Sequence, residues 1–418
     1  MKLNVGRDLY LKGRIGWRGL NKDEYLDKSE YRIINATALM DRFVDWDNCG
    51  YISKDRYDES PEIMLKENDL LISKDGTLGK IGYVKNMIGP TTVAAGIFVL
   101  RNTIPDKLNF DFLYHLLKSP IFKDFIFRNK AMGSTISHLY QEDLSEFEFE
   151  LPDIALQNDI VNVLNSIDSK IDMNLREINL IERTQSLLFD RWFLSFEFPY
   201  DDGTYKSLGK KLRYDGKIKH NIPDSWEIVK MRDVVEVRDG THESPKPNDN
   251  GFHLITSKHL TDWGIDFDAA YLISEEDYTA INQRSKVETG DILYSMIGTV
   301  GNVYKVEEEN INFAIKNVAL YKTSGIYKNR NYIYMWLKSS YMRRFTEGML
   351  SGSIQKFIGL GDLRDMYIIK PNPMIDRYCE MTKESFDKVN ALKQENQKLT
   401  NLLKTISPLV LTQKVKIV

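Results

Sequence analysis

Two segments at similar places in the two halves of the chain combine basic side chains with glycine and small polar residues. The first reads KGRIGWRGL over 12–20, and the second reads RDGTHESPK over 238–246. Their turn-forming residues predict exposed loops. Guanidinium and ammonium groups beside backbone donors suit contacts with nucleic-acid phosphates and base edges. Both segments are therefore candidate nucleic-acid contacts, the alternative being ordinary solvated surface.

A glycine-rich motif, Ser-x-x-Gly-Thr-x-Gly, occurs once in each half. The stretch NDLLISKDGTLGKIGYV at 68–84 is matched by GDILYSMIGTVGNVYKV at 290–306, 222 positions later. Apolar runs on either side of Gly-Thr predict two strands joined by a tight turn, with the glycines supplying positive φ. Lys74 and Lys80 lie on the first hairpin, and Asn302 and Lys305 lie on the second.

The glycines do not form a phosphate-binding loop. Lys80 is followed by Ile81 rather than by Ser or Thr, and the pattern continues as a strand rather than as a helix N-terminus. The six histidines show no zinc-ligand spacing, and no Ser, His and Asp arrangement indicates nucleophilic catalysis. We therefore expect a binding protein that is not an enzyme, with no metal site and no cofactor in this chain.

Charge and hydropathy narrow the class of protein further. The chain has 57 basic and 60 acidic residues, so a nucleic-acid surface must come from local segregation of charge. Two cysteines, Cys49 and Cys379, are too few for a disulfide framework and fit a reducing compartment. There is no run of 18 apolar residues and no signal-peptide pattern at the start. We expect a cytoplasmic protein with no membrane association.

The matching motifs predict a duplicated chain of α/β class and α+β type. Beyond the hairpin, Leu117-Lys118-Ser119 matches Leu337-Lys338-Ser339, and Pro152 matches Pro371. In the first half we expect strands at 70–73, 80–84, 95–100 and 147–151 and helical structure from 110 through about 125. The expected organisation is a first α/β domain at 1–151, a long helix at 152–198, a linker at 199–226, a second α/β domain at 227–371 and a second long helix at 372–410.

Both long helices carry an apolar seam at the spacing of a coiled coil, which predicts that they pack on one another in an antiparallel pair. The seam residues are Leu164, Ile167, Ile171, Asn174, Ile178 and Ile181 in the first helix and Val389, Leu392, Asn396, Leu399 and Leu403 in the second. A lone asparagine in a seam often fixes register by pairing across it. The alternative is a slightly rotated helix in which the asparagine faces water.

The chain resembles a known protein family along essentially its whole length. The duplicated hairpin, the Gly-Ser loops at 133–134 and 352–353, and the Asp-Leu pairs ahead of Pro152 and Pro371 resemble the specificity subunit of type I restriction–modification enzymes. The stretches KGRIGWRGL and RDGTHESPK resemble opening segments of target-recognition domains, and IDSKIDMN resembles the helical spacer. The second spacer departs from the pattern at Lys393 and Thr400, which interrupt its apolar surface.

The resemblance implies that each domain reads one half of a bipartite, asymmetric double-stranded DNA target while the helices set the gap. It also implies partners: two methyltransferase (modification) subunits docked along the helices, and restriction subunits that translocate DNA. S-adenosylmethionine, ATP and magnesium would belong to those partners, whose complex methylates adenine and cleaves DNA. Two alternatives stay open, namely a DNA-modifying enzyme with an unrecognised site and a two-armed coiled-coil protein adaptor.

The candidate DNA contacts are polar, basic or aromatic residues on segments that we expect to be exposed. In the first half they are Lys12, Arg14, Trp17, Arg18, Lys74, Lys80, Arg128, Lys130, Ser134 and His138. In the second half they are Arg238, Thr241, His242, Lys246, Lys258, Asn302, Lys305, Arg344, Ser353, Gln355 and Lys356.

Overall fold

The chain divides into two compact units, each of which contains parts of both long helices. A computed structural model describes residues 1–15, 19–39, 42–129, 138–199, 205–207, 212–261, 264–326, 328–350 and 357–415. The first unit comprises Met1–Met173 and Asn396–Val418, and the second comprises Asn174–Glu395. None of the helices in these described residues is long and apolar enough to cross a membrane.

The first unit is built on two small sheets. The four-stranded sheet has the order β2 (Tyr10–Gly13), β8 (Ile97–Arg101), β5 (Leu70–Ser73) and β6 (Ile81–Tyr83), all antiparallel. The three-stranded sheet has the order β4 (Gly50–Ile52), β3 (Tyr31–Ile34) and β7 (Thr91–Val93), in which β3 and β7 run parallel. The strands expected at 70–73, 80–84 and 95–100 are confirmed, with ends that shift by one or two residues.

The central strands of the four-stranded sheet are buried on both faces, which explains their continuous apolar sequences. Leu70 and Ile72 of β5 belong to the core shared with the helices, whereas Leu71, between them, belongs to the core shared with the three-stranded sheet. In β8, Phe98 lies in the core shared with the helices, and Val99 lies in the core shared with the three-stranded sheet. The sheet therefore lies between a helical layer and the second sheet.

The helical layer of the first unit contains α3 (Phe110–Lys118), α4 (Pro120–Asn129) and the start of α6 (Ile154–Phe193), as the helical spacing predicts. Shorter helices, α1 (Val5–Asp8), α2 (Lys54–Asp58) and α5 (Gln141–Ser145), connect the strands. Strand β1 (Lys2–Asn4) pairs with β9 (Glu148–Glu150), and so joins the chain's start to the segment that enters α6.

The second unit repeats this plan. Its four-stranded sheet has the order β15 (Val237–Asp239), β23 (Val318–Tyr321), β20 (Ile292–Ser295) and β21 (Val303–Lys305). Its three-stranded sheet has the order β19 (Leu272–Ile273), β16 (Phe252–Thr256) and β22 (Phe313–Lys316), with β16 and β22 parallel. The pair β14 (Ile228–Lys230) and β24 (Tyr367–Ile369) corresponds to β1 and β9. The same strand order in both units is what duplication predicts.

The helices of the second unit follow the same order. The counterparts of α3, α4 and α5 are α8 (Arg330–Lys338), α9 (Ser340–Leu350) and α10 (Leu360–Asp365), after which α11 (Pro373–Leu411) begins. Helix α7 (Glu275–Ser285), between β19 and β20, has a shorter counterpart in α2 of the first unit. A short two-stranded ribbon, β17 (Leu260–Thr261) with β18 (Gly264–Ile265), follows β16.

The segment at 199–226, expected as a polar linker, contains ordered hairpin structure. Strand β10 (Glu197–Pro199) pairs with β11 (Tyr205–Ser207), and β12 (Leu212–Asp215) pairs with β13 (His220–Pro223). Ile218, Ile222 and Trp226 are buried in the core of the second unit. These three apolar residues are spread along a turn-rich stretch and show neither helix nor strand periodicity. Their burial therefore could not be predicted from the sequence.

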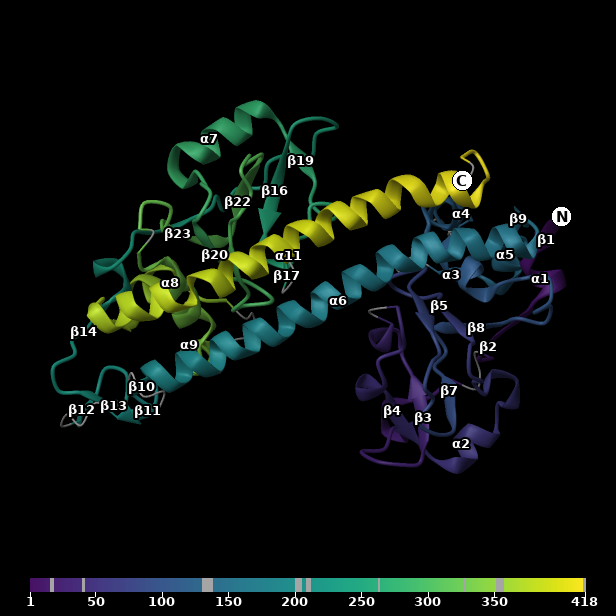
Figure 1. The fold of residues 1–418 in the computed structure, drawn as a ribbon, viewed down its shortest axis with the longest axis horizontal. Helices are drawn as coiled ribbons and strands as arrows, with labels where there is room; N and C mark the ends of the chain where they lie inside the picture. The colour runs from purple at the N-terminus through teal and green to yellow at the C-terminus, as the bar shows by residue number, and fades with distance from the viewer. Residues whose placement is uncertain are drawn as a thin grey trace. The chain divides into compact units, whose positions relative to one another are not determined.

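The two long helices run antiparallel within the second unit (Figure 1). Nδ2 of Asn174 donates to Oε2 of Glu395 at 2.8 Å, and Nε2 of Gln185 donates to Oγ of Ser385 at 2.9 Å. As residue numbers rise along α6, those of its partners fall along α11. Asn174 is only 1% exposed, so it pairs across the seam rather than facing water.

The seam residues are buried or half-buried in both helices. Ile178 packs with Val389 and Leu392 in the second unit. In the first unit, Leu164 lies in the domain core against which Leu403 packs. The remaining seam positions, Ile167, Ile171, Ile181, Asn396 and Leu399, are also at least half-buried. Lys393, expected to interrupt the seam, pairs with Glu182 at 2.9 Å.

A polar cluster ties α6 to the first domain. Nη2 of Arg42 donates to Oδ1 of Asn165 on α6 at 2.8 Å and to Oδ1 of Asp111 on α3 at 3.1 Å. His115 of α3 bonds the same Asn165 oxygen at 2.8 Å, and burial lowers the pKa of its imidazole. Since the first turns of α6 also share the domain's core, helix and domain form one packed body.

We expect the seam to contribute strongly to stability. The Ile178→Ala variant should lose about 2–5 kcal/mol of unfolding free energy, because truncation leaves a cavity between the helices. Leu180 is on the same helix but is 67% exposed, so the Leu180→Ala variant should change the unfolding free energy by less than about 0.5 kcal/mol. Urea unfolding of the two variants measures the difference; equal losses would show that α6 and α11 do not pack through this seam.

Candidate nucleic-acid interface

Each glycine-rich hairpin is held in shape by one buried serine. Ser73 Oγ donates to the Thr77 carbonyl at 2.6 Å and accepts from the Lys80 backbone N–H at 2.9 Å. Ser295 Oγ in the second domain likewise donates to the Thr299 carbonyl and accepts from the Asn302 N–H at 2.8 Å.

The glycines of both hairpins adopt the left-handed backbone that a side chain would strain. Gly76 and Gly79 have φ of 67° and 74°, and Gly298 and Gly301 have φ of 74° and 107°. A Cβ at Gly76 or Gly298 would meet nothing within 4 Å, so conformation rather than space requires glycine there. The motif therefore encodes the turn, as the sequence predicts.

A loop distant in sequence returns to each hairpin tip. Asp75 and His138 form an isolated antiparallel bridge, and the Leu139 N–H donates to the Lys74 carbonyl at 3.0 Å. In the second domain, Ile297 and Phe357 form the matching bridge, and the Ile358 N–H donates to the Met296 carbonyl at 2.9 Å. The hairpin tip and the residues that pair with it, 138–139 in the first domain and 357–358 in the second, thus make one composite surface, which we call the recognition tip.

The predicted basic residues of the first domain differ in exposure. Lys12 on β2 and Arg128 on α4 are exposed, and Lys80 is half-buried. Nζ of Lys74 lies 4.8 Å from the ring centroid of Phe98, and burial lowers the pKa of this ammonium. His138 is bonded through Nδ1 to the carboxylate of Asp75. Lys74, Lys80 and His138 therefore come together at the recognition tip.

Arg14, expected on an exposed loop, is buried with 2% of its surface exposed. Its Nε donates to the Val93 carbonyl at 3.0 Å, and its guanidinium reaches Ser60 Oγ at 3.3 Å. Burial lowers the pKa of this guanidinium. Arg14 follows β2 directly, and its side chain points into the domain against β7. The local sequence predicted a turn, but it could not reveal hydrogen-bond partners that lie 46 and 79 positions away.

Two predicted residues of the second domain are also engaged inside the protein. Lys305 is 8% exposed, pairs with Glu307 at 2.8 Å and lies 5.0 Å from the ring centroid of Phe386. Burial lowers the pKa of its ammonium. Nδ2 of Asn302 donates to the Leu260 carbonyl at 2.6 Å. Lys305 is therefore a packing residue rather than a surface contact.

Other predicted residues of the second domain remain at the surface. Lys246, Lys258 and Arg344 are exposed, and His242 is exposed while bonded to Asn317 and Asp239. Thr241 is half-buried, with its backbone bonded to β22.

A short 3-10 turn at Ser257–His259 brings Lys258 to the second recognition tip. Ser257 Oγ accepts from the Met296 N–H at 3.1 Å, and its carbonyl accepts from Thr299 Oγ1 at 3.4 Å. The exposed Lys258 follows directly, so this basic residue lies beside the hairpin.

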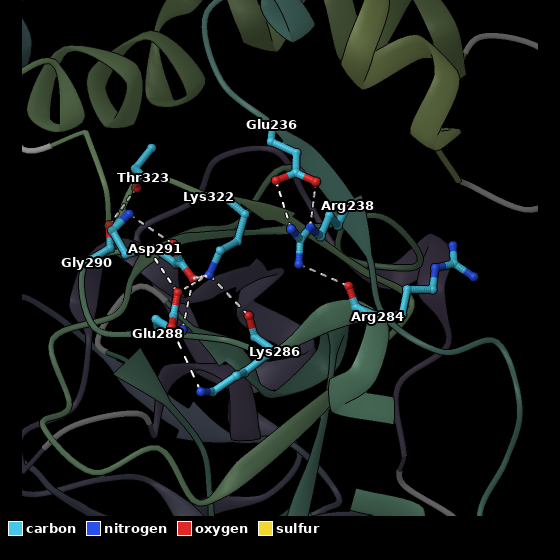
Figure 2. A network of polar contacts seen from close by, with 10 residues as sticks. Glu236, Arg238, Arg284, Lys286, Glu288, Gly290, Asp291, Lys322 and Thr323 are labelled. Atoms are coloured by element: carbon cyan, nitrogen blue, oxygen red, sulfur yellow. Dashed lines mark hydrogen bonds and ion pairs between the residues drawn. The ribbon is translucent and has the colours of Figure 1, made fainter. Parts of the chain in front are cut away.

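Arg238 belongs to a surface network rather than to the recognition tip. Its guanidinium makes two bonds of 2.8 Å to Glu236 and one of 3.3 Å to the Arg284 carbonyl (Figure 2). An open hollow of about 520 Å³ adjoins this region. Because Glu236 already neutralises Arg238, this residue is a weaker candidate for a phosphate contact than Lys258.

A buried ion pair at the base of each hairpin is repeated in both domains. Asp69, 1% exposed, accepts two bonds of 2.7 Å from Arg101. Asp291, fully buried, accepts from Lys322 Nζ at 2.5 Å and from the Glu288 N–H at 2.8 Å (Figure 2). Each carboxylate therefore ties the start of β5 or β20 to the neighbouring strand.

The remaining predicted contacts lie outside the described residues. These are Trp17, Arg18, Lys130, Ser134, Ser353, Gln355 and Lys356. Among the residues that the structure does describe, no group of three or more His, Cys, Asp and Glu could hold a metal ion.

Two residues of the second recognition tip were missed by the sequence argument. Ile297 and Phe357 are 42% and 57% exposed, although both are large and apolar. A search for basic and polar residues passes over such side chains. The signal that could have found Phe357 is its correspondence, in the duplicated alignment, to His138, which the sequence argument did select; Asp75, the counterpart of Ile297, was missed as well.

Comparison with known proteins shows which proteins the chain is similar to. Residues 16–183 match a family model described as type I restriction modification DNA specificity domain. The specificity subunits of the type I restriction enzymes MjaIX and MjaVIII of Methanocaldococcus jannaschii are 24% and 23% identical to the chain. These alignments cover 82% and 85% of this chain and 78% and 81% of the relatives.

A solved structure shares the fold. The type I restriction–modification S subunit from M. genitalium superimposes with a TM-score of 0.50 at 15% identity, covering 100% of this chain and 96% of that one.

The buried ion pair of the second domain should stabilise its hairpin. Asp291→Asn should cost about 3–5 kcal/mol of unfolding free energy, because it leaves the Lys322 ammonium without its buried charge partner. Glu288→Gln is the matched control: its side chain is 48% exposed and contacts the same ammonium, so it should cost less than about 1 kcal/mol. Urea unfolding distinguishes them; an Asp291→Asn variant as stable as the control would contradict this role.

Proposed function

We propose, from the premise that the chain belongs to the specificity subunits of type I restriction–modification enzymes, that its two domains read the two halves of a bipartite DNA target. The observation that carries this proposal is the recognition tip, which has the same backbone connections in both domains and different side chains. Asp75 and His138 in one domain correspond to Ile297 and Phe357 in the other. A shared scaffold with different contact residues suits two half-sites of different sequence.

The two long helices serve as the spacer between the half-sites in this proposal. Helix α6 has 40 residues and α11 has 39, and each carries residues of a domain core. Seam pairs such as Asn174 with Glu395 define their register. Because such polar contacts specify the register of a helix pair, the length of the two helices would set the gap between the half-sites.

The chain supplies specificity and leaves the chemistry to partners. Modification subunits would bind S-adenosylmethionine and methylate adenine, and restriction subunits would use ATP and magnesium. The DNA target and these partners would place the assembly in the cytoplasm.

One exposed face of α6 is suited to holding a modification subunit. Leu180 and Leu187 are 67% and 63% exposed and lie seven positions apart, which places both on one stripe of a helix. Arg176 and Arg183, also exposed, flank this stripe. An amphipathic helix with acidic flanks would complement it, because its apolar face would cover the leucines and its carboxylates would meet the arginines.

Exchanging one domain should change one half of the recognised sequence. A chain in which 1–150 is replaced by the corresponding region of another specificity subunit should methylate a target with a new first half and the old second half and gap. Sequencing of methylated adenines in cells that express the modification subunits measures this. A change in both halves, or in neither, would contradict the assignment of one half-site to each domain.

Charge on the α6 face should block assembly without unfolding the chain. Leu180→Lys with Leu187→Lys should weaken binding of modification subunits at least about 10-fold, since two apolar contacts are lost and two positive charges are added beside Arg183. Unfolding in urea should be unchanged. Co-purification and titration calorimetry measure the effect, with Asn179→Lys as a control that adds charge without removing a leucine; undiminished binding would place the partner elsewhere.

A further inference from the structure

We infer that the two recognition tips read DNA by different chemistry: hydrogen bonding by Asp75 and His138 in the first domain, and apolar contact of Ile297 and Phe357 with a thymine methyl group in the second. This inference rests on the proposed function and deepens it, because it assigns the kind of base contact that each domain makes.

The two tips are equivalent in backbone structure, so the comparison isolates the side chains. Each pair forms one isolated antiparallel bridge. Beside the first bridge the Leu139 N–H donates to the Lys74 carbonyl at 3.0 Å, and beside the second the Ile358 N–H donates to the Met296 carbonyl at 2.9 Å. Residues directly opposite each other in an antiparallel pair project to the same face. Asp75 and His138 meet in this way, and the geometry places Ile297 and Phe357 on the matching face.

The first tip presents hydrogen-bonding groups. The side chains of Asp75 and His138 are 43% and 30% exposed, and His138 Nδ1 is bonded to the Asp75 carboxylate. An ionised carboxylate only accepts hydrogen bonds. Because it is negatively charged, the DNA phosphates repel it. In the major groove, the groups that donate to it are the exocyclic amino groups of cytosine and adenine. The exposed ring of Tyr140, 4.7 Å from the His138 ring centroid, supports the histidine from one side.

The second tip offers no side-chain hydrogen bond at the same positions. Ile297 and Phe357 are 42% and 57% exposed there, beside the exposed Lys258. Single exposed apolar residues are ordinary on protein surfaces, but these two face the same side of a surface whose counterpart is polar. The apolar group that the major groove of DNA exposes is the thymine methyl, and phenylalanine is among the side chains that contact it.

Replacing thymine by deoxyuracil tests this assignment, because the substitution removes only the methyl group. The full chain, in complex with its modification subunits, is titrated with DNA duplexes that carry uracil at single positions of the second half-site. We expect one position at which affinity falls about four-fold, the effect of withdrawing one methyl from an apolar contact. With the Phe357→Ala variant, thymine and uracil duplexes should bind alike at that position.

The nearly isosteric Asp75→Asn variant tests the first tip. The carboxylate only accepts hydrogen bonds, whereas the amide that replaces it also donates them. Preference at one base pair of the first half-site should relax about 10-fold, while the second half-site is unchanged. That unchanged half-site, read by the same molecule, shows that the variant is folded.

The outcomes separate this inference from the proposed function. A wild-type complex with no half-site preference would overturn both. A wild-type complex that selects a bipartite target but shows no uracil effect anywhere in the second half-site would overturn the apolar assignment alone. An Asp75→Asn variant that keeps full discrimination in the first half-site would overturn the hydrogen-bonding assignment alone.

Discussion

The packing between α6 and α11 is the constraint on which the rest of the structure depends. Each helix leaves a domain whose core it helps to build: Leu164 of α6 is buried with the first domain, and Ile375 of α11 is buried with the second. A shift of one helix along the other would therefore disturb a domain core as well as the seam. Polar seam contacts such as Asn174 with Glu395 add a register that apolar packing alone would leave open.

The recognition tips combine an equivalent backbone scaffold with different side chains, as two half-sites of different sequence would require under the proposed function. Ser73 and Ser295, the positive-φ glycines and the buried Asp69 and Asp291 hold each hairpin through backbone bonds and a buried charge. These residues are the same in both copies because the turn requires them. The side chains that face outward from the tip are free to differ, since no hairpin bond depends on their identity. Under the proposed function, duplication would yield two DNA-reading domains that share one architecture.

Much of this architecture could be predicted from the sequence, because its signals are local or periodic. The apolar run at Leu70–Ser73, the glycines of the turn and the seam of α6 each lie within one segment, and each formed the element expected. The duplicated motif also predicted a second hairpin, which β20 and β21 form.

What could not be predicted depends on contacts between distant segments. Arg14 sits in a turn-rich, basic stretch, yet its partners on β7 draw it inside the domain. Lys305 ends a hairpin strand but is covered by Phe386 of α11. Phe357 gave no signal as a surface residue, because an apolar side chain in isolation predicts burial. In each case the environment is built by residues tens of positions away.

The most direct measurement of the central claim, that the helix pair sets the separation of the half-sites, lengthens both helices together. Four residues, one helical turn, are inserted after Asn174 in α6, and a matched four are inserted before Glu395 in α11. The added length is about 6 Å, and successive base pairs are about 3.4 Å apart, so methylome sequencing should find a gap longer by one or two base pairs. Both half-sites should be unchanged. An unaltered gap, or an altered half-site, would contradict the account.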